Sequence, residues 1–174
     1  MKHYIIITNR PKDPDLEITR RVQELLKLRQ ASCSVYADEI PKEEWKRILL
    51  REGDRTDAIL VLGGDGTMLR AARDTADSQI PMLGINLGTL GYLTEVEKNG
   101  MEDAIDRLVA GSYQVEDRMM LCGQIYRQGR MEEENSALND ITITRCGHLR
   151  MLYFQIYVNG KLLKEYHADG IIIA

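Results

Sequence analysis

The sequence of 174 residues contains little cysteine, and the three cysteines that it has are far apart. Their number is odd, and Cys33, Cys122 and Cys146 show neither the pattern of a disulfide framework nor the spacing of metal ligands. We therefore expect reduced, buried thiols, and we assign no residue as a metal ligand.

The chain also lacks an excess of positive charge. Its 23 lysines and arginines are outnumbered by 27 aspartates and glutamates, which gives a formal net charge of −4 and a pI near 5.5. Sequence-independent binding of nucleic acid requires a broad basic surface, so we expect no nucleic-acid partner. A local basic pocket is compatible with this composition.

Long apolar runs are missing as well. The first run, residues 4–7, ends at Thr8 and Asn9 and is too short for the core of a signal peptide or for a membrane span. The sequence thus predicts no membrane association and a cytoplasmic location. Its length suits one complete domain, or one domain and part of a second.

Apolar strands alternate with helical periodicity in the first part of the chain. Continuous apolar runs are typical of strands buried on both faces, and the strand candidates are 4–7, 34–36, 58–62 and 82–85. Helical spacing of apolar residues is found at 16–30, 43–51, 67–77 and 101–110. This alternation predicts an α/β fold, with a Rossmann-like parallel sheet, for a domain that covers residues 1–112.

From residue 113 the pattern changes to short β-like runs, at 113–117, 120–127, 141–145, 151–158, 162–167 and 170–174. Between two of them, Asn159-Gly160 is a strong signal for a two-residue hairpin. We expect residues 113–174 to form the start of an all-β domain. Because the chain stops inside its last apolar run, we expect it to be truncated within that domain.

Neither the Walker A pattern nor the G-x-G-x-x-G fingerprint is present, but the chain has another glycine-rich loop. Gly63-Gly64-Asp65-Gly66-Thr67 follows an apolar strand and precedes a helix. Glycines let backbone N–H groups approach a phosphate closely, at the edge of the sheet where α/β proteins bind ligands. The next helix can direct its N-terminus at the phosphate, with Thr67 either as its N-cap or facing the ligand.

A carboxylate among phosphate-binding glycines requires an explanation, because it repels the phosphate. In phosphoryl transfer, Asp65 could accept the proton of an attacking hydroxyl or hold a ribose hydroxyl in line. A turn aspartate that bonds to its own backbone is the alternative, but the position between strand and helix favours the catalytic role. Arg70, one helical turn further on, either adds positive charge to the site or lies on the helix surface.

Five blocks, taken together and in this order, make the sequence similar to the NAD kinase family. They are ILVLGGDGTMLRAA at 59–72, GINLGTLGYL at 84–93, EDRMML at 116–121, ALND at 137–140 and DGII at 169–172. Diacylglycerol and sphingosine kinases share the GGDGT motif, but they usually continue with an asparagine and a glutamate and carry a later Gly-Thr-Gly-Asn. This chain has neither feature, which favours NAD kinase over a lipid kinase.

The resemblance implies a kinase that transfers a phosphoryl group from ATP, or in some members polyphosphate, to the 2′-hydroxyl of the adenosine ribose of NAD, giving NADP. It implies a divalent metal, normally Mg²⁺, with the donor, and a homodimer or homotetramer. By position, Asp65 matches the proton acceptor, and Gly66 and Arg70 match neighbouring ligand contacts, beside Gly64 and Thr67 of the loop. Further NAD-binding positions are matched by Asn139, Asp140, Arg150, His167 and Asp169.

Two departures from the family pattern bear on activity. Asp140 stands where the family has glutamate, so its side chain is one methylene shorter. A Thr-Pro-x-Gly-Ser-Thr-Ala-Tyr-like segment is missing, which supports the expected truncation and leaves the NAD site of this chain incomplete. A lipid kinase or a non-catalytic nucleotide-binding fragment stays open as an alternative. Single residues also have alternatives without a ligand contact: a turn at Asn139, a solvated charge at Arg150 and a strand-edge residue at His167.

Overall fold

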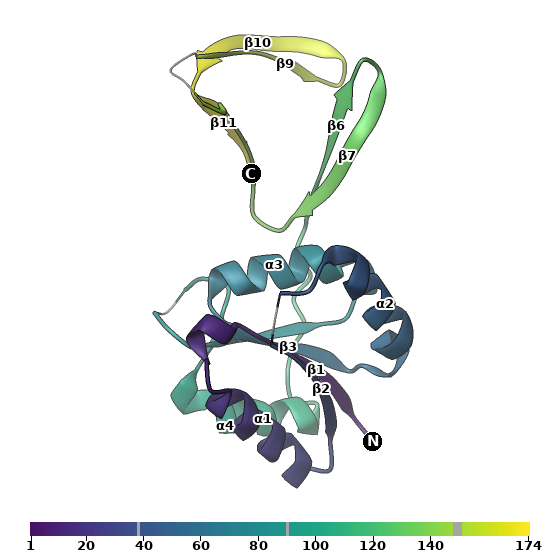
Figure 1. Ribbon diagram of the computed structural model, residues 1–174, viewed down its shortest axis with the longest axis vertical. Helices are drawn as coiled ribbons and strands as arrows, with labels where there is room; N and C mark the ends of the chain where they lie inside the picture. Colours follow the sequence, from purple (N-terminus) through teal and green to yellow (C-terminus); the bar gives the residue numbers. More distant parts are fainter. Residues whose placement is uncertain (38, 90, 148–150) are drawn as a thin grey trace. The chain divides into compact units, whose positions relative to one another are not determined.

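The structure is a computed structural model that describes residues 1–37, 39–89, 91–147 and 151–174. The chain divides into two compact units, Met1–Arg118 and Met119–Ala174 (Figure 1). This division falls six residues after the boundary predicted from the sequence, and the functional assignment of the two parts stays a prediction.

A five-stranded parallel sheet forms the centre of the first unit, with the strand order β2-β1-β3-β4-β5. The strands are β1 (His3–Thr8), β2 (Ser32–Tyr36), β3 (Ala58–Gly63), β4 (Met82–Asn86) and β5 (Val96–Glu97). The neighbouring strands β1 and β3 are buried along their whole length, which explains their continuous apolar runs. The predicted α/β fold with a Rossmann-like sheet is therefore confirmed.

Helices cover both faces of this sheet, α1 and α4 on one face and α2 and α3 on the other (Figure 1). Their bounds are α1 (Glu17–Leu28), α2 (Lys42–Glu52), α3 (Asp65–Thr75) and α4 (Met101–Ala110). Side chains alternate along each strand, so Tyr4 and Ile6 join the core under α1 and α4, while Ile5 and Ile7 join the core under α2 and α3. Four 3-10 turns complete the unit: η1 (Arg10–Lys12), η2 (Gly53–Arg55), η3 (Ala76–Ser78) and η4 (Lys98–Gly100). Among the described residues, no helix has the length and apolar character to cross a membrane.

The second unit consists of antiparallel strand pairs, β6 with β7, β9 with β10 and β8 with β11. The strands are β6 (Leu121–Arg127), β7 (Arg130–Ala137), β8 (Ile141–Thr144), β9 (Leu152–Val158), β10 (Lys161–Ala168) and β11 (Gly170–Ile173). The hairpin predicted at Asn159-Gly160 is confirmed, with positive φ angles of 51° and 77° at the two residues. Gln128 and Gly129 have the same geometry between β6 and β7, with φ angles of 50° and 76°.

Three local predictions were wrong. Residues 113–117 form no strand, although they carry β-forming side chains. The strand β7 was missed because its sequence, RMEEENSA, is polar and largely exposed, so it has no alternating apolar pattern. Cys122 and Cys146 are exposed rather than buried, because the second unit buries few of its side chains.

Candidate functional site

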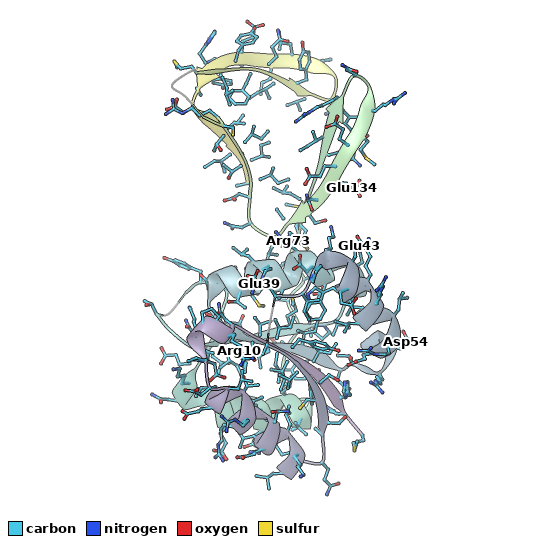
Figure 2. The ribbon with its side chains drawn as sticks, viewed as in Figure 1. Arg10, Glu39, Glu43, Asp54, Arg73 and Glu134 are labelled. Atoms are coloured by element: carbon cyan, nitrogen blue, oxygen red, sulfur yellow. The ribbon has the colours of Figure 1, made fainter. Side chains whose placement is uncertain are left out.

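A cavity of about 480 Å³ opens in the first unit at the carboxyl ends of β1, β2 and β3. The strand order places β2 and β3 on opposite sides of β1, and ligands of open α/β sheets bind in the crevice at such a switch in strand order. The predicted glycine-rich loop forms part of its wall. The lining residues, of which Figure 2 labels Arg10 and Glu39, are Thr8, Asn9, Arg10, Pro11, Lys12, Ala37, Glu39, Gly64, Asp65, Gly66, Thr67 and Arg70.

The loop passes directly from β3 into α3. Gly64 is the N-cap residue and Asp65 the first residue of the helix, so the predicted N-cap role of Thr67 is wrong. Thr67 is buried in the first turn, where its hydroxyl accepts a hydrogen bond of 2.9 Å from the Asn9 side-chain amide. A Cβ atom on Gly63 would lie only 2.3 Å from the Thr67 hydroxyl oxygen. Glycine is therefore required there by close packing.

Asp65 is held by the segment that follows β4. Its carboxylate accepts hydrogen bonds from the backbone N–H groups of Tyr92, at 2.8 Å, and Leu93, at 3.1 Å. These two N–H groups hold the pKa of the Asp65 carboxyl below its usual range. A Cβ atom on Gly91 would lie 2.1 Å from an Asp65 carboxylate oxygen. The carboxylate thus fixes this segment beside the glycine-rich loop, and only glycine fits at position 91.

The hydrogen bonds leave Asp65 able to meet a ligand. Each carboxylate oxygen has two lone pairs, and each accepts one backbone N–H group, with the Thr94 hydroxyl a further 3.5 Å contact on one of them. The side chain is half-buried and lines the cavity. It can therefore accept a hydrogen bond from a hydroxyl group, and its lowered pKa makes it a weak proton acceptor.

Arg70 lines the same cavity from the second turn of α3, where its guanidinium pairs with the carboxylate of Glu39. The Glu39 side chain is 85% exposed, and ion pairs of this kind contribute little to stability. A phosphate in the cavity can therefore compete with Glu39 for the guanidinium. Arg70 therefore lies near the loop, as expected from the sequence. Its role in binding stays a prediction.

Lys12 was missed in the sequence, although it belongs to the wall of this cavity. Its amino group faces two glycines, because a Cβ atom on Gly64 would lie 2.7 Å from Nζ and one on Gly88 would lie 3.2 Å from it. The available signal was the basic Arg10-Pro11-Lys12 stretch directly after a buried strand, which ends at the ligand-binding edge of the sheet.

The described residues offer no ready-made metal cage. Within them, no group of three or more histidine, cysteine, aspartate or glutamate side chains is placed to hold a metal ion. Mg²⁺ is often bound by one or two carboxylates together with water and the phosphates of a substrate. Asp65 is the carboxylate of the loop, and its oxygens keep lone pairs beside the two backbone N–H groups that they accept.

The remaining predicted residues lie in the second unit, apart from Arg150, which is outside the described residues. Asn139 and Asp140 are exposed between β7 and β8, with 3.4 Å between the Asn139 amide nitrogen and an Asp140 oxygen. His167 is exposed on β10, and its ring lies 5.0 Å from that of Tyr153. These positions suit ligand contacts, but nothing in their surroundings restricts them to that role.

Asp169 precedes β11 and pairs with Arg145 at 3.4 Å. The ladder between β8 and β11 joins Gly170 to Thr144 at one end and Ile173 to Ile141 at the other. Asp140 and Asp169 therefore lie at opposite ends of this ladder, and the second unit does not bring the two carboxylates together.

Known proteins are similar to this chain in sequence and in fold. The family model described as the ATP-NAD kinase N-terminal domain matches residues 4–113. The chain is similar to an NAD kinase of Agathobacter rectalis, with 43% identity over 175 residues that cover 100% of this chain and 61% of that protein. An NAD kinase of Lachnospira eligens is 38% identical over 183 residues, covering 100% of this chain and 60% of that protein.

A solved structure, yeast NADH kinase complexed with NADH, matches with a TM-score of 0.72 and 19% identity, over 98% of this chain and 57% of that chain. At this identity the match shows the fold alone. The chain spans about 60% of the length of the curated relatives it matches.

Proposed function

Because this chain belongs to the NAD kinase family, we propose that the protein transfers the terminal phosphoryl group of ATP to the 2′-hydroxyl of the adenosine ribose of NAD, giving NADP. The family match covers residues 4–113, which include the whole cavity wall. ATP as the donor, NAD as the acceptor and any partner subunits are part of this proposal, since the chain spans only part of the length of its relatives.

One observation supports the proposal most strongly. The Gly63–Thr67 loop, with the Asp65 carboxylate, and three cationic residues, Arg10, Lys12 and Arg70, line one cavity at the ligand-binding edge of the sheet. Phosphoryl transfer is largely a matter of positioning and of stabilising charge on phosphate oxygens. Backbone N–H groups at the head of α3 and the cations suit the phosphates, and the carboxylate suits a hydroxyl group.

Asp65 then acts on the ribose hydroxyl as an acceptor that holds it in line with the phosphoryl group. Two backbone N–H groups lower the pKa of the Asp65 carboxyl. This supports a role in orienting the ribose hydroxyl more than a role in removing the hydroxyl proton before transfer. A loose transition state requires little advance deprotonation of the attacking group. The carboxylate takes up the proton as the new bond to phosphorus forms.

Residues of the second unit also belong to this proposal. Asn139, Asp140, Arg150, His167 and Asp169 would contact NAD, as the family pattern implies, with Mg²⁺ accompanying the ATP phosphates. Polyphosphate as a donor, a homodimer or homotetramer, and a cytoplasmic location stay predictions.

A lipid kinase is the second candidate, and the comparisons do not favour it. The relatives reported above are named NAD kinases. Acceptor choice separates the two candidates directly.

The test is an assay of the full-length protein with γ-labelled ATP, Mg²⁺ and either NAD or diacylglycerol vesicles as acceptor. We expect label in NADP, identified by its reduction with an NADP-specific dehydrogenase, and none in lipid. Label in lipid alone, or binding of ATP and NAD without turnover, would overturn the proposal.

A further inference from the structure

The side chain of Lys12 reaches across the mouth of the glycine-rich loop. Its Nζ lies so close to Gly64 and Gly88 that a methyl group on either would be in contact with it, at 2.7 Å and 3.2 Å. These two glycines follow β3 and β4, whereas Lys12 follows β1. Three segments from three strands therefore meet at one ammonium group.

A buried polar cluster next to η1 fixes the backbone that carries Lys12. Asp13 is 4% exposed, and its carboxylate accepts hydrogen bonds from the backbone N–H groups of Ile18 and Thr19, at 3.2 Å and 2.9 Å. The same carboxylate accepts the Thr19 hydroxyl at 2.7 Å, and Thr19 contacts Thr8 on β1 at 2.9 Å. This cluster ties η1, which carries Lys12, to both α1 and the end of β1.

The ammonium group itself has no protein partner in the part of the chain that the structure describes. Neither a hydrogen bond nor an ion pair to Nζ occurs there, whereas Arg70 on the same wall is paired with Glu39. A lysine that is only solvated at the surface does not need to pack over two glycines. An unpaired cation beside Gly64, the N-cap residue of α3, forms an anion site instead.

We propose that Lys12 binds the phosphate chain of a nucleotide, spanning the gap between the Gly64 and Gly88 segments. The ligand is a polyanion with adjacent phosphates, because one ammonium between two glycine segments can contact oxygens of two neighbouring groups. This inference rests on the proposed function, under which two sources have that chemistry: the triphosphate of ATP and the pyrophosphate of NAD.

The test compares Lys12→Met and Lys12→Arg with wild type in the full-length protein. Lys27→Met is the matched control, since Lys27 is an exposed lysine of α1 outside the cavity wall. Inorganic tripolyphosphate is the probe in calorimetry, and KM for ATP and for NAD is measured by NADP formation. Thermal unfolding of each variant verifies that it is folded.

A charged hydrogen bond to phosphate corresponds to about tenfold to hundredfold in affinity. We expect Lys12→Met to weaken tripolyphosphate binding by that factor, Lys12→Arg to recover part of it, and Lys27→Met to change nothing. A rise of KM for ATP alone identifies the triphosphate as the ligand, and a rise for NAD alone identifies the pyrophosphate.

The proposal is overturned if wild type does not bind tripolyphosphate, or if folded Lys12→Met binds it as wild type does. The binding measurement does not require turnover. If the protein made no NADP, the proposed function would fail while tripolyphosphate binding still decided the role of Lys12.

Discussion

The carboxylate of Glu52, at the end of α2, allows a quantitative prediction about stability. The residue is 4% exposed, and the Tyr36 hydroxyl and the Arg51 guanidinium each donate a hydrogen bond of 2.9 Å to it. Burial raises the pKa of its carboxyl, but polar contacts with Ser34, Arg51 and Tyr36 outweigh burial and lower the pKa from 4.5 to about 2. The polar and charged groups that face it are His3, Ser34, Tyr36, Arg51 and Arg55.

The sign of the effect follows from this lowered pKa. The unfolded chain binds the proton more tightly than the folded one, so the contribution of Glu52 to stability is complete above pH 4.5 and falls as the pH drops toward 2. At about 1.36 kcal/mol for each pH unit, the two pKa values give a loss of about 2 kcal/mol between pH 6 and pH 3.

Urea unfolding at several pH values measures this loss in wild type and in Glu52→Gln. Trp45, the single tryptophan, is 4% exposed on the same helix and provides the fluorescence signal. Glu43→Gln is the control, because the Glu43 side chain, labelled in Figure 2, is 78% exposed on α2. We expect the stability difference between wild type and Glu52→Gln to shrink by about 2 kcal/mol from pH 6 to pH 3. Parallel curves for these two proteins would refute the reasoning.

Two further substitutions test residues that hold Asp65 and Lys12 of the cavity wall in place. Gly91→Ala should reduce turnover, because its Cβ would lie 2.1 Å from an Asp65 carboxylate oxygen and displace the carboxylate. The control Gly100→Ala, whose Cβ has its nearest contact at 3.9 Å, should leave turnover unchanged, and equal turnover of the two variants would contradict this. Asp13→Asn should cost about 1–3 kcal/mol in urea unfolding, because a buried carboxylate loses hydrogen bonds. The same variant should weaken tripolyphosphate binding through Lys12, and unchanged stability and affinity would argue against the cluster behind η1.

The sheet could be predicted from the sequence because β1 and β3 are buried on both faces and carry continuous apolar runs. The helix α4, Met101–Ala110, was predicted with its observed bounds, since its apolar residues follow a helical period. β7 could not be found in this way, because its exposed side chains carry no alternation. The two residues of β5 are too few for any pattern.

The glycine-rich loop could also be predicted, because the spacing of glycines between a strand and a helix is local information. The contact between Asp65 and the backbone of Tyr92 and Leu93 could not, since it joins segments 27 and 28 residues apart. Lys12, which follows β1, approaches Gly64, which follows β3, and no local sequence pattern predicts this contact. For the same reason, the sequence alone did not show that Asp140 and Asp169 lie at opposite ends of a ladder.

The most direct test of the account is the turnover of NAD to NADP by full-length Asp65→Asn beside wild type. Asparagine keeps the shape of the side chain but places an NH₂ group against the N–H of Tyr92 or Leu93, and it removes the charge that takes up the hydroxyl proton. We expect kcat to fall by about 10²–10³-fold, with thermal unfolding showing a folded protein. Turnover close to that of wild type would contradict it.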